Sequence, residues 1–146
     1  MTLARRLLVG SLIVVGALVL IVTVIIDRRV GSRLIDETTR ALAREASLVA
    51  LQWTRGTDAD SLANRIGAAL GHRVTLVDST GRVIGDSEFD GLALGQLENH
   101  SARPEIVAAR SAPFGSARRA SPSAGDEELY VAVRAPLGTA RVSVST

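Results

Sequence analysis

Residues 73–87 read RVTLVDSTGRVIGDS, and this stretch decides the fold. Its two ends, 73–78 and 82–87, are short and contain the β-branched residues that are typical of strands. Between them lies the sequence Ser-Thr-Gly at 79–81, a set of residues that favours a turn. Two strands joined by so short a connection pair in antiparallel fashion. The stretch therefore predicts a β-hairpin.

The sequence after this hairpin contains three more strand patterns, at 115–121, 129–135 and 140–144. In the second of them apolar and polar residues alternate, which indicates a strand with one buried face. Leu129, Val131 and Val133 share the inward face, whereas Tyr130 and Arg134 point outward. A turn is expected just before this strand, at 123–126.

Two short helices are predicted beside the strands. The first covers 61–70, with Thr57, Asp58 or Asp60 as its cap and Gly71 at its end. The second begins at Arg103-Pro104, where the missing N–H of proline has no cost, and continues to about Ser111. A loop-like connection is expected at 92–96. Together these elements predict an α+β domain, with a five-stranded, mostly antiparallel sheet and helices on one face.

A long helix is predicted from Ser32 to Trp53, because this segment has no proline and no internal glycine. One stripe along it consists of Ile35, Thr39, Leu42, Ala46, Val49 and Trp53. The stripe either packs on its own domain or pairs with its twin in a homodimer. Fewer than three heptads do not decide between these interpretations. The helix can pack on its own domain and also pair in a homodimer if these two contacts use different sectors of its surface.

Residues 7–26, LLVGSLIVVGALVLIVTVII, contain no charged side chain. As a helix this segment spans about 30 Å, the thickness of a membrane hydrocarbon core. A cleaved signal peptide would have a shorter apolar run and a small-x-small site before Asp27, and neither is present. We therefore predict an uncleaved membrane helix. Arg5 and Arg6 favour a cytoplasmic N-terminus, but arginines beyond residue 27 compete with them.

Composition excludes several classes of function. The part from Asp27 onward holds one small domain and leaves no room for a kinase or hydrolase core of ~200 residues. The chain has no Cys and only two His, so we expect no metal site and no cofactor. The sequence pI of about 10.3 suggests a basic protein. From Asp27 onward, however, fifteen Arg balance fifteen Asp and Glu, and aromatic residues are only 3% of the chain. We therefore do not expect nucleic acid as a partner.

No catalytic motif is present in the sequence: it lacks lysine, Gly-x-Ser-x-Gly and a Gly-rich phosphate loop. Two acidic groups suggest acid–base chemistry, but each has a structural interpretation. Asp78 and Asp86 flank the hairpin turn, where aspartates commonly bond backbone N–H groups, and we assign them a structural turn together with Gly81. The acidic residues at 126–128 are expected to face the arginines at 118–119 across a β-ladder.

The segment 98–105, ENHSARPE, collects polar and titratable groups at the entrance of a helix. Our candidate ligand-binding residues are Asn99, His100, Arg103 and Glu105. A helix N-terminus favours anions, and His100 could change its charge near neutral pH. The alternative is capping of the helix by Ser101 or Asn99, with Arg103 paired to a glutamate. Capping is the more common use of such residues.

Three stretches, GHRVTLVDSTGRVIGDSE, LENHSARPEI and ELYVAVRAP, resemble the extracytoplasmic sensor domain of bacterial two-component sensor histidine kinases. The phosphate-regulon and cell-wall-sensing kinases are the most similar type. The matching residues are Asp78, Gly81, Val83, Asp86, Ser87, Asn99, His100, Arg103, Pro104, Glu105, Leu129, Tyr130, Val131, Ala132 and Val133. The resemblance implies a PAS-like or Cache-like fold, a place in the cell membrane and an extracytoplasmic domain.

The resemblance also implies a division of the chain: a cytoplasmic 1–6, a membrane helix at 7–26, a juxtamembrane dimerisation helix at 27–56 and the sensor domain at 57–146. Such kinases continue with a second membrane helix, a HAMP linker and kinase domains, which are absent from this sequence. We therefore expect an input module without phosphoryl-transfer activity, either a fragment or a truncated form. It would sense an unknown small molecule or envelope protein. The alternatives are a single-pass envelope scaffold that binds a partner, and the input domain of a chemoreceptor.

Overall fold

The computed structural model of the chain describes residues 3–120 and 127–145, without the side chains of 3–9 and 27–32. Its contacts divide the chain into two units, Met1–Thr38 and Thr39–Thr146. The described part of the first unit is helical, and the second unit contains all five strands.

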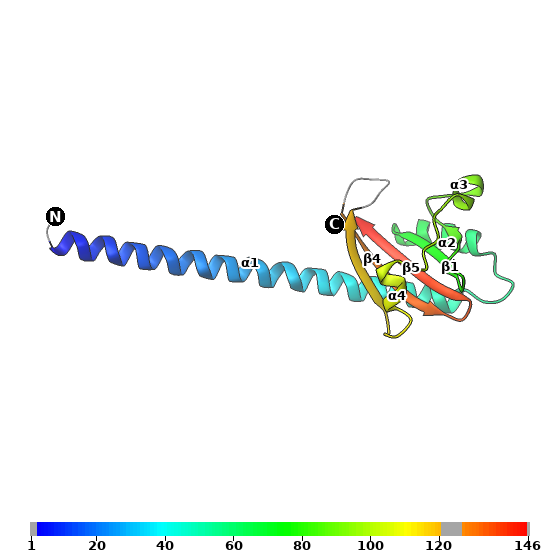
Figure 1. The fold of residues 1–146 in the computed structure, drawn as a ribbon, viewed down its shortest axis with the longest axis horizontal. Helices are drawn as coiled ribbons and strands as arrows, with labels where there is room; N and C mark the ends of the chain where they lie inside the picture. The colour runs from blue at the N-terminus through cyan, green and yellow to red at the C-terminus, as the bar shows by residue number, and fades with distance from the viewer. Residues whose placement is uncertain (1–2, 121–126, 146) are drawn as a thin grey trace. The chain divides into compact units, whose positions relative to one another are not determined.

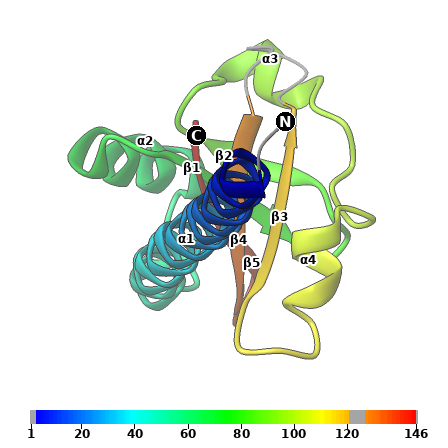
Figure 2. The same cartoon turned by 90° about the vertical axis from the view of Figure 1, so that its left-hand side faces the viewer.

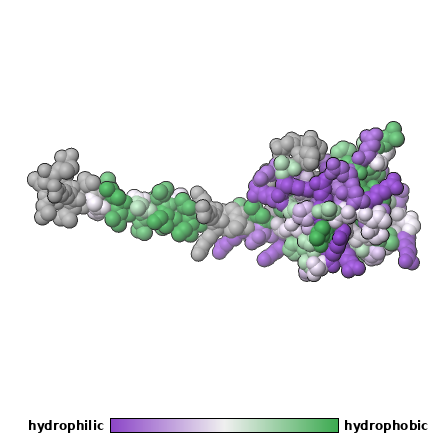
Figure 3. Space-filling view, in the orientation of Figure 1, coloured by the Kyte–Doolittle hydropathy of each residue, from purple (hydrophilic) through white to green (hydrophobic). Residues whose placement is uncertain are grey.

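Helix α1 (Leu3–Gln52) contains the apolar segment 7–26. Its large apolar side chains from Leu12 to Ile26 are exposed, by between 43% and 77%, and Figure 3 shows this stretch in green. Among the residues that the structure describes, none of the helices has the length and apolar character that a membrane crossing needs. The predicted segment begins with 7–9, whose side chains lie outside the described residues, and the membrane helix stays a prediction.

In the second unit, the predicted stripe of α1 packs against the unit's own sheet. Leu42, Ala46 and Val49 are at most 1% exposed, and Trp53, just after the helix, is 2% exposed. All four belong to one core cluster with Val131 and other residues of the strands. The interpretation that the stripe packs on its own domain is therefore confirmed for these residues.

The strands form one sheet in the order β2-β1-β5-β4-β3. Figure 1 labels three neighbouring strands of this sheet, β1, β5 and β4. They are β1 (Arg73–Asp78), β2 (Val83–Asp86), β3 (Gly115–Ala120), β4 (Glu127–Ala135) and β5 (Gly138–Ser145). Every neighbouring pair is antiparallel. The predicted hairpin is present as β1 and β2, and the last strand, β5, lies between β1 and β4. The predicted five-stranded antiparallel sheet is confirmed.

The shorter helices differ in part from the prediction. Helix α2 (Ala59–Leu70) is capped by Asp58, whose side chain accepts a hydrogen bond from the Ser61 N–H at 2.7 Å, and Gly71 ends it at φ 69°. Helix α4 (Pro104–Ala108) is shorter than expected. A one-turn helix, α3 (Gly91–Gly95), replaces the predicted loop. The turn predicted at 123–126 lies outside the described residues.

The sheet is covered on both faces. Helices α1 and α2 pack on the face that carries Val74, Leu76, Val131 and Val142, among other apolar residues. Their neighbours Val77 and Ala132 point the opposite way and pack with Ile106 and Ala109, at and just after α4. Figure 2 shows α2 and α4 on opposite sides of the strands. The expectation of helices on one face was therefore wrong, since alternation indicates which residues share a face but not what covers each face.

Burial of Tyr130 follows from this second layer. The alternation of β4 placed Tyr130 outward, yet it is only 3% exposed. The outward face of the strand is therefore a second interior, and the residues on it must satisfy their polar groups there.

We predict that Val131→Asp unfolds the second unit. Val131 is fully buried on the face toward α1. An unpaired carboxylate there costs several kcal/mol, comparable to the total stability of a small domain, about 5–15 kcal/mol. Thermal unfolding of the full chain, followed by circular dichroism, should lose its cooperative transition. Ser116→Asp is the matched control, because Ser116 lies opposite Val131 in the ladder but is exposed. Equal melting of the two variants would contradict the assigned face.

Candidate functional site

The sheet face toward α4 carries a group of polar side chains that are wholly or largely buried. We call this group the polar cluster; its members are Arg73, Thr75, Asp86, Arg119, Glu128, Tyr130, Arg141, Ser143 and, from α4, Glu105. The strand register brings them together. Thr75 lies opposite both Asp86 and Arg141, and Arg119 lies opposite Glu128. All five strands contribute to one continuous polar layer.

One end of the polar cluster is saturated with hydrogen bonds. Arg73 donates through Nε to both oxygens of Asp86, at 3.0 and 3.2 Å, and through Nη2 to Oδ2 at 3.0 Å. The hydroxyl of Thr75 donates to the same Oδ2 at 2.8 Å. The backbone N–H of Glu88 donates to Oδ1 at 3.0 Å. Such a forked pair satisfies a carboxylate that is completely buried.

The centre of the polar cluster is the carboxylate of Glu105, which is fully buried. Its Oε1 accepts hydrogen bonds from Nη2 of Arg119 at 3.2 Å and from Nη1 of Arg141 at 3.3 Å. Arg141 is 2% exposed and also donates to the hydroxyl of Thr75 at 3.0 Å. Burial, and then the charge of Arg73, lower the pKa of Arg141, whereas Glu105 opposes this shift. One carboxylate oxygen thus serves two guanidinium groups.

The ring of Tyr130 lies close to the same two arginines. The guanidinium carbon of Arg119 is 3.9 Å from the centre of its ring, and that of Arg141 is 5.0 Å away. Both distances are within the range of cation–π attraction. The ring therefore helps to hold the two cations beside each other, which their mutual repulsion would otherwise oppose.

Several buried polar atoms of the polar cluster have no hydrogen-bond partner within the described residues. They are Oε2 of Glu105, Oε2 of Glu128, Nε of Arg141, and Nε and Nη1 of Arg119; Nδ1 of the adjacent His100 is a further one. Buried polar groups are nearly always paired, since leaving one unpaired costs about 1–3 kcal/mol. The unpaired nitrogens belong to the two arginines that contact Glu105 and Tyr130, whereas no atom of the Arg73–Asp86 pair is among the unpaired ones.

A glycine allows α4 to reach the sheet. Gly115, on β3, has no side chain, and a Cβ there would collide with the backbone carbonyl oxygen of Glu105 and with the N–H of Ala109. The close approach of α4 to β3 therefore requires glycine at this position. It places the Glu105 side chain between Arg119 and Arg141.

His100 is buried beside the polar cluster, and its backbone N–H donates to the carbonyl of Gly81 at 2.7 Å. Burial lowers the pKa of His100 to about 3, with further contributions from Arg141 and Arg103. The imidazole is therefore neutral at physiological pH. The sequence-based idea that His100 changes its charge near neutral pH was wrong, because burial among arginines disfavours the imidazolium.

The other predicted site residues of this segment lie at the surface. The Asn99 side chain accepts from the Ser101 N–H at 2.8 Å and donates to the carbonyl of Thr80 at 3.0 Å. Arg103 pairs with the exposed Glu98 at 2.9 Å. Capping of α4 by Ser101 or Asn99 was also wrong: the N-cap is Arg103, and its side chain makes no cap hydrogen bond. Of the four candidates, only Glu105 is in the polar cluster.

The predicted turn residues separate in the same way. Asp78 accepts from the backbone N–H groups of Thr80 and Arg82, at 2.8 and 3.0 Å, and Gly81 has a φ of 88°. Both are in the turn. Asp86 lies at the end of β2, and its carboxylate belongs to the polar cluster. The predicted pairing across the β3–β4 ladder exists between Arg118 and Glu127, at 2.6 Å, whereas Asp126 is outside the described residues.

Sequence reasoning missed Arg119, Arg141, Tyr130 and Glu128 as site residues. A signal for Arg141 was present, because it interrupts the apolar residues Ala140 and Val142 on a strand in the middle of the sheet. Tyr130 and Glu128 lie on the same outward face of β4, two residues apart. An outward face that meets a second layer cannot be recognised from one strand.

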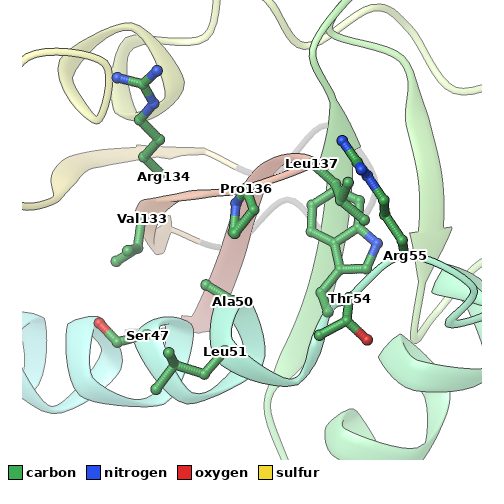
Figure 4. Close-up of a pocket in the computed structure, with 10 residues that line it drawn as sticks. Ser47, Ala50, Leu51, Thr54, Arg55, Val133, Arg134, Pro136 and Leu137 are labelled. Atoms are coloured by element: carbon green, nitrogen blue, oxygen red, sulfur yellow. The ribbon is translucent and has the colours of Figure 1, made fainter.

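The opposite face of the sheet carries an apolar groove beside α1. A hollow of about 510 Å³ is lined by Ala50, Leu51, Trp53, Val133, Pro136 and Leu137, among others. Figure 4 shows Ala50 and Leu51 on the α1 side of this hollow, with Arg134 extending away from it. A second hollow, of about 600 Å³, continues past Leu48 and Phe114 and shares Val133 with the first. Neither has the charged groups of the polar cluster.

No group of three or more His, Asp or Glu side chains suited to a metal ion occurs in the described part of the chain. The acidic groups of the polar cluster face arginines instead. The described ion pairs of the polar cluster are therefore pairs of carboxylates with guanidinium groups.

Comparison with solved structures finds the same fold in a receptor domain. The ligand-binding domain of the amino acid chemoreceptor PctC of Pseudomonas aeruginosa PAO1, in complex with GABA, superposes with a TM-score of 0.53 at 15% identity. The match covers 76% of this chain and 55% of that domain, so the chain spans about half of its length. The chain therefore shares the α+β fold of that ligand-binding domain over most of its length.

No protein-family model matches the chain. No curated protein sequence matches it either. At 15% identity the structural likeness shows the fold alone.

We predict that His100 makes the protein less stable in acid. The pKa of His100 is about 3 in the folded chain, against about 6.5 when unfolded, so the unfolded state gains a proton first as pH falls. The free energy of unfolding should fall as pH decreases below ~6.5, by up to about 1.4 kcal/mol per pH unit. Above that pH, His100 is neutral in both states and should not change the free energy of unfolding. Urea unfolding at several pH values should show a smaller acid loss for His100→Gln. Parallel pH profiles for the two proteins would contradict this.

Proposed function

We propose that this chain is the extracytoplasmic signal-sensing input module of a membrane-bound two-component sensor histidine kinase. The single observation that carries the proposal is the polar cluster, which lies on a sheet face of a domain with the fold of a chemoreceptor ligand-binding domain. The fold supports a sensor in general. The kinase type rests on the resemblance of its hairpin, Asn-His-x-x-Arg-Pro-Glu segment and β4 to such kinases.

The location in the membrane is part of the proposal. Residues 12–26 expose many large apolar side chains, which water does not favour and a lipid environment does. We place residues 1–6 in the cytoplasm and the domain outside, as in the sensor kinases that the sequence resembles. The chain then lies in the cell membrane, with the polar cluster in the extracytoplasmic space.

Strand β5 gives the module a path for the signal. Arg141 and Ser143 face the polar cluster, whereas Ala140 and Val142, on the other face of the same strand, pack in the core that contains α1 residues. A signal that changes the position of Arg141 therefore acts on the packing of α1. The bound signal must favour one arrangement of β5 and α1 through its own binding energy. In a full kinase, the shift would pass from β5 to the next membrane helix.

Sequencing the DNA downstream of codon 146 tests this proposal. We expect a second apolar segment, a HAMP linker and a helix with a phosphoryl-accepting histidine. A long signalling helix without a kinase domain would favour the chemoreceptor input domain instead. A stop codon directly after Thr146 would favour a single-pass scaffold and would contradict the kinase proposal.

We also propose a homodimer through the α1 segment between Ser32 and Trp53. The stripe residues from Leu42 to Trp53 are buried in the core of the domain. Leu48 and Leu51 lie on another sector of the helix and are 57% and 76% exposed. Leu48 lies between the hollow near Phe114 and another of about 300 Å³ beside Ile66. A ridge with hollows on both sides can pack against a second copy of itself, as a two-fold interface requires.

Single-cysteine variants test the dimer, because the chain has no native cysteine. Under mild oxidation, Leu48→Cys in membranes should form a disulfide-linked dimer, since equivalent residues meet near a two-fold axis. Ser79→Cys, exposed at the β1–β2 turn, is the control and should stay monomeric on a non-reducing gel. Equal cross-linking of both variants, or none with Leu48→Cys, would contradict the interface.

A further inference from the structure

The unpaired atoms of the polar cluster carry both signs of charge. Oε2 of Glu105 and Oε2 of Glu128 are unpaired acceptors of carboxylates, and Nε of Arg141 and two nitrogens of Arg119 are unpaired donors of guanidinium groups. Glu105 and Arg141 are at most 2% exposed, and Glu128 is 7% exposed. The two arginines converge on Glu105 and on the ring of Tyr130. Glu128 lies opposite Arg119 in the β3–β4 ladder, so the unpaired groups belong to one part of the sheet face.

The charge balance of this region indicates the class of ligand. Arg73 and Asp86 are joined by three hydrogen bonds, and Arg73 also pairs at 3.3 Å with Glu88, whose side chain is 54% exposed and outside the polar cluster. What remains is two cations, Arg119 and Arg141, and two anions, Glu105 and Glu128. His100 adds no charge, because its pKa of about 3 leaves it neutral. The charges of these four residues therefore balance, and unsatisfied groups of each sign occur among them.

A ligand with only one sign of charge does not fit this arrangement. Inorganic phosphate would pair with Arg119 but would bring its negative charge against Glu105 and Glu128. A simple cation would pair with the glutamates and meet the arginines. Like charges at contact distance in a desolvated site are strongly unfavourable. A molecule with a carboxylate and an ammonium group offers an acceptor to the guanidinium groups and donors to the carboxylates.

We propose that the polar cluster binds a small zwitterion, with its carboxylate toward Arg119 and Arg141 and its ammonium group toward Glu105 and Glu128. The inference rests on the proposed sensor function and adds to it the class of signal. Because Glu105 Oε1 already holds both arginines, the bound carboxylate shares these donors with α4. Binding therefore acts on α4, β3, β4 and β5 together.

Binding of the common L-α-amino acids to the full chain in detergent micelles tests this proposal. Each amino acid is compared with its N-acetyl derivative, its C-terminal amide and inorganic phosphate, by thermal shift and calorimetry. We expect at least one amino acid to bind saturably and to raise the melting temperature. Removal of either charge should weaken its binding by about tenfold or more, as expected for the loss of charged hydrogen bonds.

Two variants and two matched controls locate the binding. Arg119→Gln and Glu128→Gln remove one charge of each sign without a large change of shape, and each should weaken binding by about tenfold or more. Arg118→Gln and Glu127→Gln change the neighbouring residues on the same strands, whose pair is 45% and 57% exposed, and should bind like the parent. A cooperative unfolding transition checks that each variant is folded.

Three results would overturn the proposal: no binding by any amino acid, equal binding of a capped derivative, or binding of phosphate alone. Equal weakening by the control variants would also overturn it. These outcomes are distinct from failure of the sensor proposal, which the downstream gene sequence decides. If the gene encodes a kinase domain downstream but the chain binds no zwitterion, the sensor proposal stands and the zwitterion proposal is wrong.

Discussion

The pairing of buried charges on one face of the sheet is the constraint on which the rest of the domain depends. The carboxylate of Glu105 is fully buried and is held by Arg119 of β3 and Arg141 of β5. Leaving a buried charge without its partner costs about 3–5 kcal/mol, a large part of the stability of a small domain. Helix α4 must therefore stay close to the sheet, and Gly115 provides the space for it. These contacts tie one short helix and two strands into a single unit.

A protein that needed only stability would not require this arrangement. Replacement of buried ion pairs by apolar residues is often neutral or stabilising, so a charged interior is weak evidence for a purely structural role. The described polar cluster also leaves several charged atoms unpaired, beside a fully satisfied Arg73–Asp86 pair. The Arg73–Asp86 end of the polar cluster is satisfied, whereas the end with Glu105, Arg119 and Arg141 is not. This contrast is the basis of our proposal that a bound molecule supplies the missing hydrogen-bond partners.

Both layers of the domain meet in the central strand β5. Successive side chains of a strand point to opposite faces, so Arg141 contacts the polar cluster while Ala140 and Val142 pack in the core that includes α1 residues. A shift of the β5 backbone would therefore move both faces together. The sheet thus connects a polar interior to the helix that we propose as dimer interface and membrane anchor. The exposed Leu48 and Leu51 supply apolar surface on a sector of that helix that the core does not use.

The sequence by itself determined the local elements. The β-branched runs and the Ser-Thr-Gly turn predicted the β1–β2 hairpin, Asp58 and Gly71 marked the ends of α2, and alternation identified the buried face of β4 around Val131. These are short-range effects of backbone preference and side-chain periodicity. The apolar stripe of α1 was found in the same way. The sequence left open whether it packs on its own domain or against a second copy, and the structure shows that it packs on its own domain.

Only the tertiary structure decided the site. Glu105, Tyr130 and Arg141 are far apart in the sequence and meet because β5 inserts between β1 and β4 and α4 covers the second face. The insertion of β5 has no local signal, and neither has the choice of the sheet face that α4 covers. For the same reason the sequence grouped Asn99, His100 and Arg103 with Glu105, although only the Glu105 side chain joins the polar cluster. Adjacent residues at a helix entrance point in different directions, and the layer above the sheet decides which of them is buried.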